Sequence, residues 1–376
     1  MTRWHLLTCE YPPDIGGVSA YTGQLARALA ATGDDVHVWC SGDSRLAQAG
    51  VTVHAALGSW SPRDLRRINA QLDTCPGPRR LLVQWVPHGF GYRSMNLPFC
   101  LWLAWRARAG DLVELMVHEP YSDFSWRPWH ALMAGVHRVM TMLLLASVCR
   151  AWISIPAWEP CLRPYALGRD VPMTWLPIPG CVAPGVQADG APVRPRYAVP
   201  AQPLVGHFGS HGQAVASLLG ACLPEIMTDP RQPALLLMGS DSTDYRQRLI
   251  ASHPAWATRV HATGFLEDQQ LASHLAACDV LLQPYPDGVT SRRTSVMACL
   301  SQGRAVVTTA GRLTEALWTA SGAVVLADVA EPVRIAHEVL RLLDDATSRA
   351  RLGARARQLY DETFTIDHVV MALRAA

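Results

Sequence analysis

The sequence contains no lysine, so all 33 of its basic residues are arginine. This absence excludes a lysine that forms a Schiff base and a phosphate-binding loop built around a lysine. The ten cysteines include no C-x-x-C pair and no Cys/His group at zinc-ligand spacing, which favours a reducing compartment. No Asp-x-Asp pair lies in a suitable loop either, so the sequence does not predict a metal site of that kind.

Charge and long apolar runs are also scarce. Only 17% of the residues are charged and the net charge is +2, which gives no reason to expect a nucleic-acid partner. The longest apolar run, from Val139 to Cys149, is shorter than the roughly 20 residues that a membrane-spanning helix needs. The sequence also opens without the pattern of a signal peptide. We therefore expect a cytoplasmic protein, soluble or attached at most to a membrane surface.

The 376 residues exceed what one ordinary core accommodates, so two domains are expected. Short apolar segments alternate with amphipathic ones, a pattern typical of parallel α/β sheets. The expected strands are Trp4–Cys9, Asp35–Cys40, Arg80–Val86, Leu112–His118, Ala151–Ile155, Met173–Leu176, Leu204–Phe208, Ala234–Met238, Val260–Ala262, Val280–Gln283 and Ala305–Thr308. The clearest expected helices are Pro62–Leu72, Trp126–Cys149, Glu331–Leu343 and Arg349–Tyr360. We predict an α/β fold with domains at 1–183 and 204–360, a Pro- and Gly-rich linker at 184–203 and a final helix at 361–376.

The stretch Glu10-Tyr11-Pro12-Pro13-Asp14-Ile15-Gly16-Gly17-Val18 joins a predicted strand to a predicted helix. Two prolines stop the strand, and two glycines allow the backbone to approach another group closely. The unpaired N–H groups and the dipole at a helix start favour an anion, so this turn predicts a phosphate-bearing ligand. The alternative is a tight loop that only needs small residues.

These residues, taken with later motifs in the same order and spacing, resemble glycosyltransferase family 4. The later motifs are Gly33–Val38, Val205–Gly209, Leu237–Ser240, Thr263–Leu266, Ala277–Pro284 and Gly303–Thr309. The resemblance covers nearly the whole chain. It implies the GT-B fold, in which two Rossmann-like domains face a cleft and the last helix returns to the first domain. It also implies sugar transfer from a nucleotide-diphosphate sugar, of UDP or GDP type, to a hydroxyl acceptor on a glycan, glycolipid or small metabolite.

The resemblance assigns roles by position, and implies retention of configuration without a metal or another cofactor. It implies donor contacts at Gly16, Gly17, Gly209, Ser210, His211, Gly239, Gly264 and Phe265. His118 and Glu119 follow an apolar strand and match the family's active-site histidine region. The alternatives are a structural histidine that bonds a loop carbonyl and a glutamate that caps a helix. We place Tyr11, Asp14, His88 and Tyr121 on the acceptor side.

Two departures from the family pattern concern the donor site. The segment Gln213–Ser217 lacks the basic residues that commonly clamp the diphosphate, and Thr290 and Ala298 stand where the family has two glutamates. Instead, a turn carries Arg292, Arg293, Thr294 and Ser295. We predict that the two arginines and the N–H groups of Thr294 and Ser295 contact the diphosphate, because arginine matches phosphate geometry well.

Three further interpretations of the sequence remain open. Two tryptophans and other large apolar residues stand beside three arginines over 93–108, which suits a peripheral membrane contact but equally suits packing or an acceptor-site wall. The lost glutamates favour a catalytically degenerate GT-B protein that only binds its ligand. A sugar-nucleotide epimerase of related fold is the third reading, although it needs carboxylates around the sugar.

Overall fold

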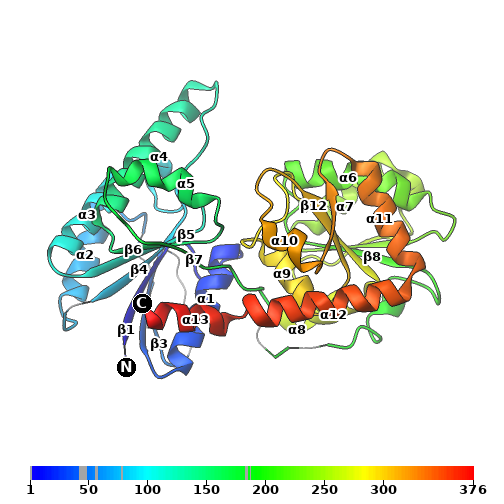
Figure 1. The fold of residues 1–376 in the computed structure, drawn as a ribbon, viewed down its shortest axis with the longest axis horizontal. Coiled ribbons are helices and arrows are strands. Elements are labelled where there is room, and N and C mark those ends of the chain that lie inside the picture. Colours follow the sequence, from blue (N-terminus) through cyan, green and yellow to red (C-terminus); the bar gives the residue numbers. More distant parts are fainter. Residues whose placement is uncertain (1, 42–48, 56–57, 78, 183–184, 187) are drawn as a thin grey trace. The chain divides into compact units, whose positions relative to one another are not determined.

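The computed structural model describes residues 2–41, 49–55, 58–77, 79–182, 185–186 and 188–376. It divides the chain into two compact units (Figure 1). Unit 1 contains Met1–Pro177 and Ile366–Ala376, and unit 2 contains Ile178–Thr365. Part of the predicted linker therefore packs within unit 2, where Arg194 pairs with Asp279 at 2.8 Å.

Unit 1 is built on a seven-stranded sheet whose strands are all parallel, in the order β3-β2-β1-β4-β5-β6-β7. The strands are β1 (Arg3–Thr8), β2 (Asp35–Cys40), β3 (Val51–His54), β4 (Arg80–Trp85), β5 (Leu112–Val117), β6 (Arg150–Ile153) and β7 (Met173–Trp175). The helices are α1 (Gly17–Ala31), α2 (Pro62–Leu72), α3 (Leu97–Arg108), α4 (Pro128–Ser147), α5 (Trp158–Leu162) and α13 (Ile366–Ala375), with short 3-10 turns at Tyr92–Ser94 and Arg163–Ala166.

Helices pack on unit 1 because apolar stripes face the sheet. Helix α2 starts at Ser61, whose hydroxyl accepts the Asp64 N–H while Asp64 accepts the Ser61 N–H, a reciprocal cap that fixes where the helix begins. Its apolar residues Leu65, Ile68 and Leu72 are then buried in the core formed with α3 and α4. The last helix, α13, packs on α1 within the same unit.

Unit 2 contains a second parallel sheet, in the order β10-β9-β8-β11-β12-β13. Its strands are β8 (Leu204–Phe208), β9 (Ala234–Met238), β10 (Val260–Ala262), β11 (Val280–Gln283), β12 (Val306–Ala310) and β13 (Val325–Asp328). Its helices are α6 (Gln213–Met227), α7 (Ser242–Ser252), α8 (Asp268–Ala277), α9 (Thr294–Ser301), α10 (Ala316–Ser321), α11 (Pro332–Asp344) and α12 (Ala346–Thr363), with 3-10 turns at Arg194–Arg196 and Pro254–Trp256.

Both sheets reverse their strand order once, between β1 and β4 in unit 1 and between β8 and β11 in unit 2. In doubly wound sheets, ligands bind beyond the carboxyl ends of the strands at such a reversal. The loops after β1, β4 and β5, and those after β8, β9 and β11, are therefore where each unit's binding residues are expected. The α/β fold prediction is confirmed, with two parallel sheets of this type.

The apolar length of α4 differs from the expectation, because no apolar run in the sequence was long enough to span a membrane. Within the described residues it is the one helix long and apolar enough to cross a membrane by length and composition, and 33% of its most apolar stretch is buried. Its later turns supply Met140, Leu144 and Leu145 to the core of unit 1. Helix α4 is thus a core helix over that part of its length.

Helix α3 also departs from one reading of the sequence. Arg106, which lies among the tryptophans of 93–108, is 1% exposed and donates to the Asp73 carboxylate at 2.7 Å. It also pairs with Asp111. A buried, paired arginine is not available to a membrane surface, so this part of the segment has a packing role.

Stacked histidines on neighbouring strands make unit 1 sensitive to acid. The rings of His5 and His37 lie 5.0 Å apart, and those of His37 and His54 lie 5.2 Å apart. Burial and the neighbouring His37 lower the pKa of His5 to about 3 and that of His54 to about 4. Because the unfolded chain binds these protons below pH ~6.5, folding stability is fully present above that pH and decreases as the pH falls.

We therefore expect the thermal midpoint to fall between about pH 7 and about pH 5, since each such histidine contributes up to about 1.4 kcal/mol per pH unit. Calorimetric scans at these pH values measure the slope. His54→Gln should reduce it, whereas His337→Gln, an exposed position on α11, should leave it unchanged. A midpoint independent of pH over this range would contradict the expectation.

Candidate active site

Three glycines at the carboxyl ends of β8, β9 and β10 form one glycine cluster in unit 2, composed of Gly209, Gly239 and Gly264. All three have positive φ, and a Cβ on Gly239 would lie 2.3 Å from the Gly209 carbonyl oxygen. The Gly209 N–H donates to the Met238 carbonyl, and the Gly239 N–H donates to the Gly264 carbonyl. Only glycine fits at Gly239, because a Cβ there would collide with the loop after β8. Beside Gly264, by contrast, a Cβ would meet no heavy atom within 4 Å among the described residues.

The start of α9 lies beside this cluster. The Ser295 hydroxyl oxygen is 3.4 Å from the place that a Cβ on Gly209 would occupy. It shares a hydrogen bond of 2.7 Å with the Tyr285 hydroxyl, and the Arg293 guanidinium carbon is 4.8 Å from the centre of the Tyr285 ring. The structure thus brings together the predicted donor residues Gly209, Arg293 and Ser295.

Two helix starts in unit 2 have no acidic residue in their own first turn. Among the described residues, no side chain caps α6 at Gly212 or α9 at Arg293, and neither first turn carries an acidic residue. Unpaired N–H groups and the helix dipole favour an anion at such positions. The exposed Ser210 precedes α6 and the half-buried Thr294 begins α9, so both predicted donor residues lie at these helix starts.

A buried carboxylate holds the arginine turn in place. Glu315, just before α10, accepts the Ser291 backbone N–H at 2.7 Å and the Trp318 indole N–H at 2.7 Å. It also accepts the Ser291 hydroxyl. Burial raises the pKa of this carboxyl, while its bonds to Ser291 act in the opposite direction. Glu315 therefore fixes the backbone that presents Arg292.

We expect Glu315→Ala to weaken donor binding about tenfold or more, because loss of the acceptor leaves buried N–H groups unpaired and frees the turn. Calorimetric titration with a nucleoside diphosphate measures the change in Kd. Glu331→Ala, an exposed carboxylate near α11 that pairs with Arg334, is the matched control. A Kd unchanged in a folded Glu315→Ala variant would contradict the positioning role.

His211 lies in the loop between β8 and α6. Its side chain is 2% exposed, and its Nδ1 atom lies 3.0 Å from the Asp241 carboxylate. Its backbone N–H also donates to Asp241, at 2.8 Å. Burial lowers the pKa of the imidazole, although Asp241 opposes this change. The His211 side chain thus anchors the loop after β8, and the donor contact expected of it stays a prediction.

The two positions aligned with the missing glutamates lie in the interior. Ala298 is fully buried in the middle of α9 and its backbone N–H lies 3.1 Å from the place of a Cβ on Gly180. Thr290 is 1% exposed, and its hydroxyl oxygen is buried with no partner among the described residues. The residue of α9 that approaches the glycine cluster is Ser295, whereas Phe265, 54% exposed, follows Gly264 at the cluster's edge.

In unit 1, His118 lies just after β5 and is 7% exposed. Its Nε2 atom is 2.9 Å from the Gln84 amide oxygen on β4, and the edge of its ring meets Tyr21 of α1 at 5.3 Å between ring centroids. Because an amide oxygen only accepts, Nε2 carries the proton in this arrangement. Two strands and a helix therefore fix the orientation of His118, as the histidine of an active site requires.

The turn at Gly16 and Gly17 already contains a negative group from this chain. The Glu10 carboxylate accepts the Ser19 N–H at 3.0 Å and lies 2.3 Å from the place of a Cβ on Gly16. Beside Gly17, by contrast, a Cβ would meet no heavy atom within 4 Å among the described residues. A diphosphate contact here stays a prediction, and a carboxylate beside it suits the hydroxyl groups of a sugar.

The remaining predicted residues of unit 1 have mixed exposure. Asp14 and His88 are exposed, and His88 Nε2 lies 3.2 Å from the Ser122 hydroxyl. Tyr11 is 1% exposed, so its ring belongs to the interior. Burial raises the pKa of Tyr121 to about 12, and its hydroxyl donates to the Cys161 carbonyl. Glu119 is half-buried directly after His118.

Sequence reasoning missed three residues that these contacts single out. Glu10 lies beside the predicted residue Gly16, and Gln84 lies beside the predicted residue His118. In the sequence, each is marked only as a polar residue at or just beyond the end of an apolar strand. Glu315 gave no such signal, because 24 residues separate it from its partner Ser291. Within the described residues, no group of three His, Cys, Asp or Glu side chains is arranged to hold a metal ion.

Two family models match the sequence. Residues 15–153 match the model described as Glycosyltransferase Family 4, and residues 202–345 match the model described as Glycosyl transferases group 1. The chain belongs to glycosyltransferase family 4. A comparison of this glycosyltransferase with curated proteins finds no match.

Solved structures share the fold of the glycosyltransferase over its full length. Sucrose-phosphate synthase from Thermosynechococcus elongatus is 16% identical with a TM-score of 0.77, covering 100% of this chain and 98% of that chain. HepE from Anabaena, in complex with UDP and glucose, is 16% identical with a TM-score of 0.72 and covers 100% and 99%. The α,α-trehalose-phosphate synthase (UDP-forming) from Burkholderia xenovorans is 12% identical with a TM-score of 0.70 and covers 100% and 99%. These similarities confirm the GT-B fold.

Proposed function

We propose that this glycosyltransferase moves a sugar from a nucleoside-diphosphate sugar to a hydroxyl acceptor, with retention and without a metal. The observation that carries the donor assignment is the glycine cluster of unit 2 with Ser295 and Arg293 beside it. A surface without side chains, two uncapped helix starts and an arginine pair match the needs of a diphosphate. The exposed Phe265 offers a face on which a nucleobase stacks.

Unit 1 supplies the residues that we assign to the sugar and the acceptor. His118 is oriented by Gln84 and Tyr21, and Glu10 with Asp14 offers carboxylate oxygens to hydroxyl groups. In the proposed step, the bond from C1 to the diphosphate oxygen breaks and the acceptor oxygen bonds to C1 on the same face. The acceptor proton passes to the departing phosphate oxygen, so no protein base is needed. Stabilisation of the leaving diphosphate by arginine and helix N–H groups then contributes most of the rate.

The donor nucleotide is proposed to be UDP or GDP, and UDP is the first choice for an assay. HepE and the Burkholderia synthase are described as a complex with UDP and as UDP-forming. The acceptor is a hydroxyl on a glycan, a glycolipid or a small metabolite. Independence from metal is part of the proposal, and the comparison of EDTA with Mg²⁺ in the titration tests it.

Titration calorimetry with UDP, GDP and ADP, each with EDTA and then with Mg²⁺, tests the donor assignment. We expect one of the first two to bind in EDTA, with an affinity that Mg²⁺ leaves within about threefold. Release of the nucleoside diphosphate from its sugar donor, measured with and without hydroxyl acceptors, then distinguishes transfer from binding alone. Absence of binding for all three nucleotides would overturn the donor site, and a product of inverted configuration would overturn retention.

A further inference from the structure

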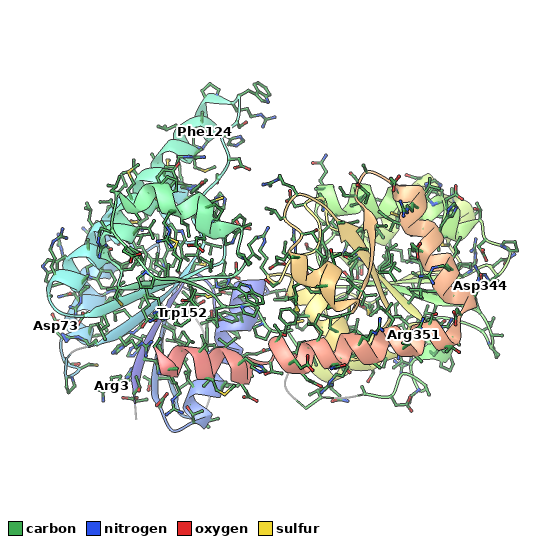
Figure 2. All side chains as sticks on the ribbon, in the orientation of Figure 1. Arg3, Asp73, Phe124, Trp152, Asp344 and Arg351 are labelled. Atoms are coloured by element: carbon green, nitrogen blue, oxygen red, sulfur yellow. The ribbon has the colours of Figure 1, made fainter. Side chains whose placement is uncertain are left out.

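The start of α4 and the loop before it project from unit 1 without covering any of its core. No residue from Pro128 to Met133 is buried, and Ala134 is the first buried residue of the helix. Figure 2 shows Phe124, which precedes the helix, at the far end of this projection. We call residues 124–132 the α4 tip. The exposed side chains of the α4 tip therefore take no part in packing the core of unit 1.

The α4 tip is strongly apolar for an exposed surface. Trp126 is 88% exposed, Phe124 is 62% exposed, Leu132 is 54% exposed and Trp129 is 45% exposed. Large apolar side chains gathered at one exposed place mark an interaction surface. Helix α3 exposes fewer large apolar side chains than the α4 tip. Its Leu101 and Trp105 are exposed, whereas Phe99, Cys100 and Leu103 face the core.

The charge near this surface is positive on balance. The exposed Asp123 directly precedes it, but from Phe124 to Trp158 the sequence contains no aspartate or glutamate, whereas Arg127 and Arg138 lie within that region. The Arg127 guanidinium carbon is 5.5 Å from the centre of the Trp126 ring, and that of Arg138 is 4.0 Å from the centre of the Phe124 ring. Arg138 also donates to the Ser122 and Ala134 carbonyls, so it attaches the loop to α4.

We propose that the α4 tip docks onto an anionic lipid bilayer. Tryptophan and phenylalanine enter the interface between headgroups and acyl chains, while arginine pairs with anionic headgroups. The exposed aromatic side chains of the α4 tip and its Arg127 satisfy both requirements, and the attachment of the loop by Arg138 keeps the aromatic residues in place. The proposal concerns this surface alone and does not depend on the donor or on the sugar transferred.

Co-sedimentation of the full chain with lipid vesicles tests the proposal. One set is phosphatidylcholine alone, and the other contains about 30% phosphatidylglycerol, enough to give the negative surface potential of an anionic membrane. We expect the chain to sediment with the anionic set, and less so as salt is raised. The double variant Trp126→Ser/Trp129→Ser should bind at least about tenfold more weakly, because both side chains lose their apolar contact.

Two further variants keep the test specific. Arg127→Glu should also reduce binding to the anionic vesicles, because it reverses one charge while it keeps the aromatic side chains. Val333→Ser removes a side chain that is 50% exposed on α11 in unit 2, and it should leave binding unchanged. Circular dichroism confirms that each variant is folded, which is expected since the α4 tip covers no core.

Two results would overturn the proposal. The first is a wild-type chain that sediments no better with anionic vesicles than without them. The second is a double tryptophan variant that sediments as well as the wild type. If the wild type does not bind vesicles but is a dimer by analytical ultracentrifugation, and the double variant is a monomer, the α4 tip is an interface between copies of this chain.

Discussion

Replacing Arg292 and Arg293 together by alanine is expected to reduce kcat/KM for the sugar donor by about 100-fold to 1,000-fold, because charge-assisted bonds to phosphate are each worth about 1.5–3 kcal/mol. The expectation rests on the position of Arg293, over the Tyr285 ring and beside the Ser295 hydroxyl that approaches Gly209. Steady-state kinetics and calorimetric titration with the nucleoside diphosphate both measure the effect. The Kd should rise as well as the KM.

The single variants separate the two arginines. Arg293→Ala should account for most of the loss, since Arg293 lies over the Tyr285 ring whose hydroxyl bonds Ser295, whereas the charge of Arg292 also acts on Glu315. Arg293→Lys should recover only part of the activity, because an ammonium cannot form the paired bonds of a guanidinium. Arg312→Ala is the matched control, as this arginine is exposed and pairs with Asp287 at 3.2 Å. Unchanged KM and kcat in a folded double variant would remove the arginines from the donor site.

Most of the fold follows from local pattern in the sequence. Strands such as β2, β8, β9 and β11 coincide with their predicted ranges because each is a short run of apolar residues in a parallel sheet. The prediction missed β3 and β13, which lie at the edges of their sheets. Each has only four residues, and neither has a burial pattern that distinguishes it from a loop. The other two edge strands, β7 and β10, overlap their predicted ranges, so edge position alone did not hide β3 and β13.

The site is less predictable than the fold, because its geometry depends on contacts between distant segments. Gly209, Gly239 and Gly264 follow strands that the apolar runs predicted, whereas the donor contacts expected of these glycines stay a prediction. Glu315 could not be predicted, because its partner Ser291 belongs to another loop. The aligned position Ala298 proved to be in the interior of α9, whereas Ser295 lies beside Gly209. The prediction that the arginine turn leads into a helix start agrees with α9, which begins at Thr294.

The second large effect is expected from His118→Ala, which should lower kcat by about 100-fold to 1,000-fold, the loss typical when one preorganised hydrogen-bonding group is removed from an active site. The Kd for the nucleoside diphosphate should change by less than about threefold, because we assign the diphosphate contacts to unit 2. Single-turnover kinetics with calorimetric titration separate these quantities. A structural histidine would lower the thermal midpoint without this split.

Gln84→Leu and His88→Ala provide the comparison that decides the role of His118. Gln84→Leu keeps the imidazole but removes the 2.9 Å bond that orients it, so kcat should fall by only about tenfold while Kd is unchanged. His88→Ala removes an exposed imidazole that contacts Ser122, and should raise the KM for the acceptor more than it lowers kcat. If kcat of the folded His118→Ala variant stays within about twofold of the wild type, His118 has only a structural role between β4 and β5. If His118 contacts the transferred sugar, kcat should be lower in His118→Ala than in Gln84→Leu. His88→Ala should instead change mainly the KM for the acceptor.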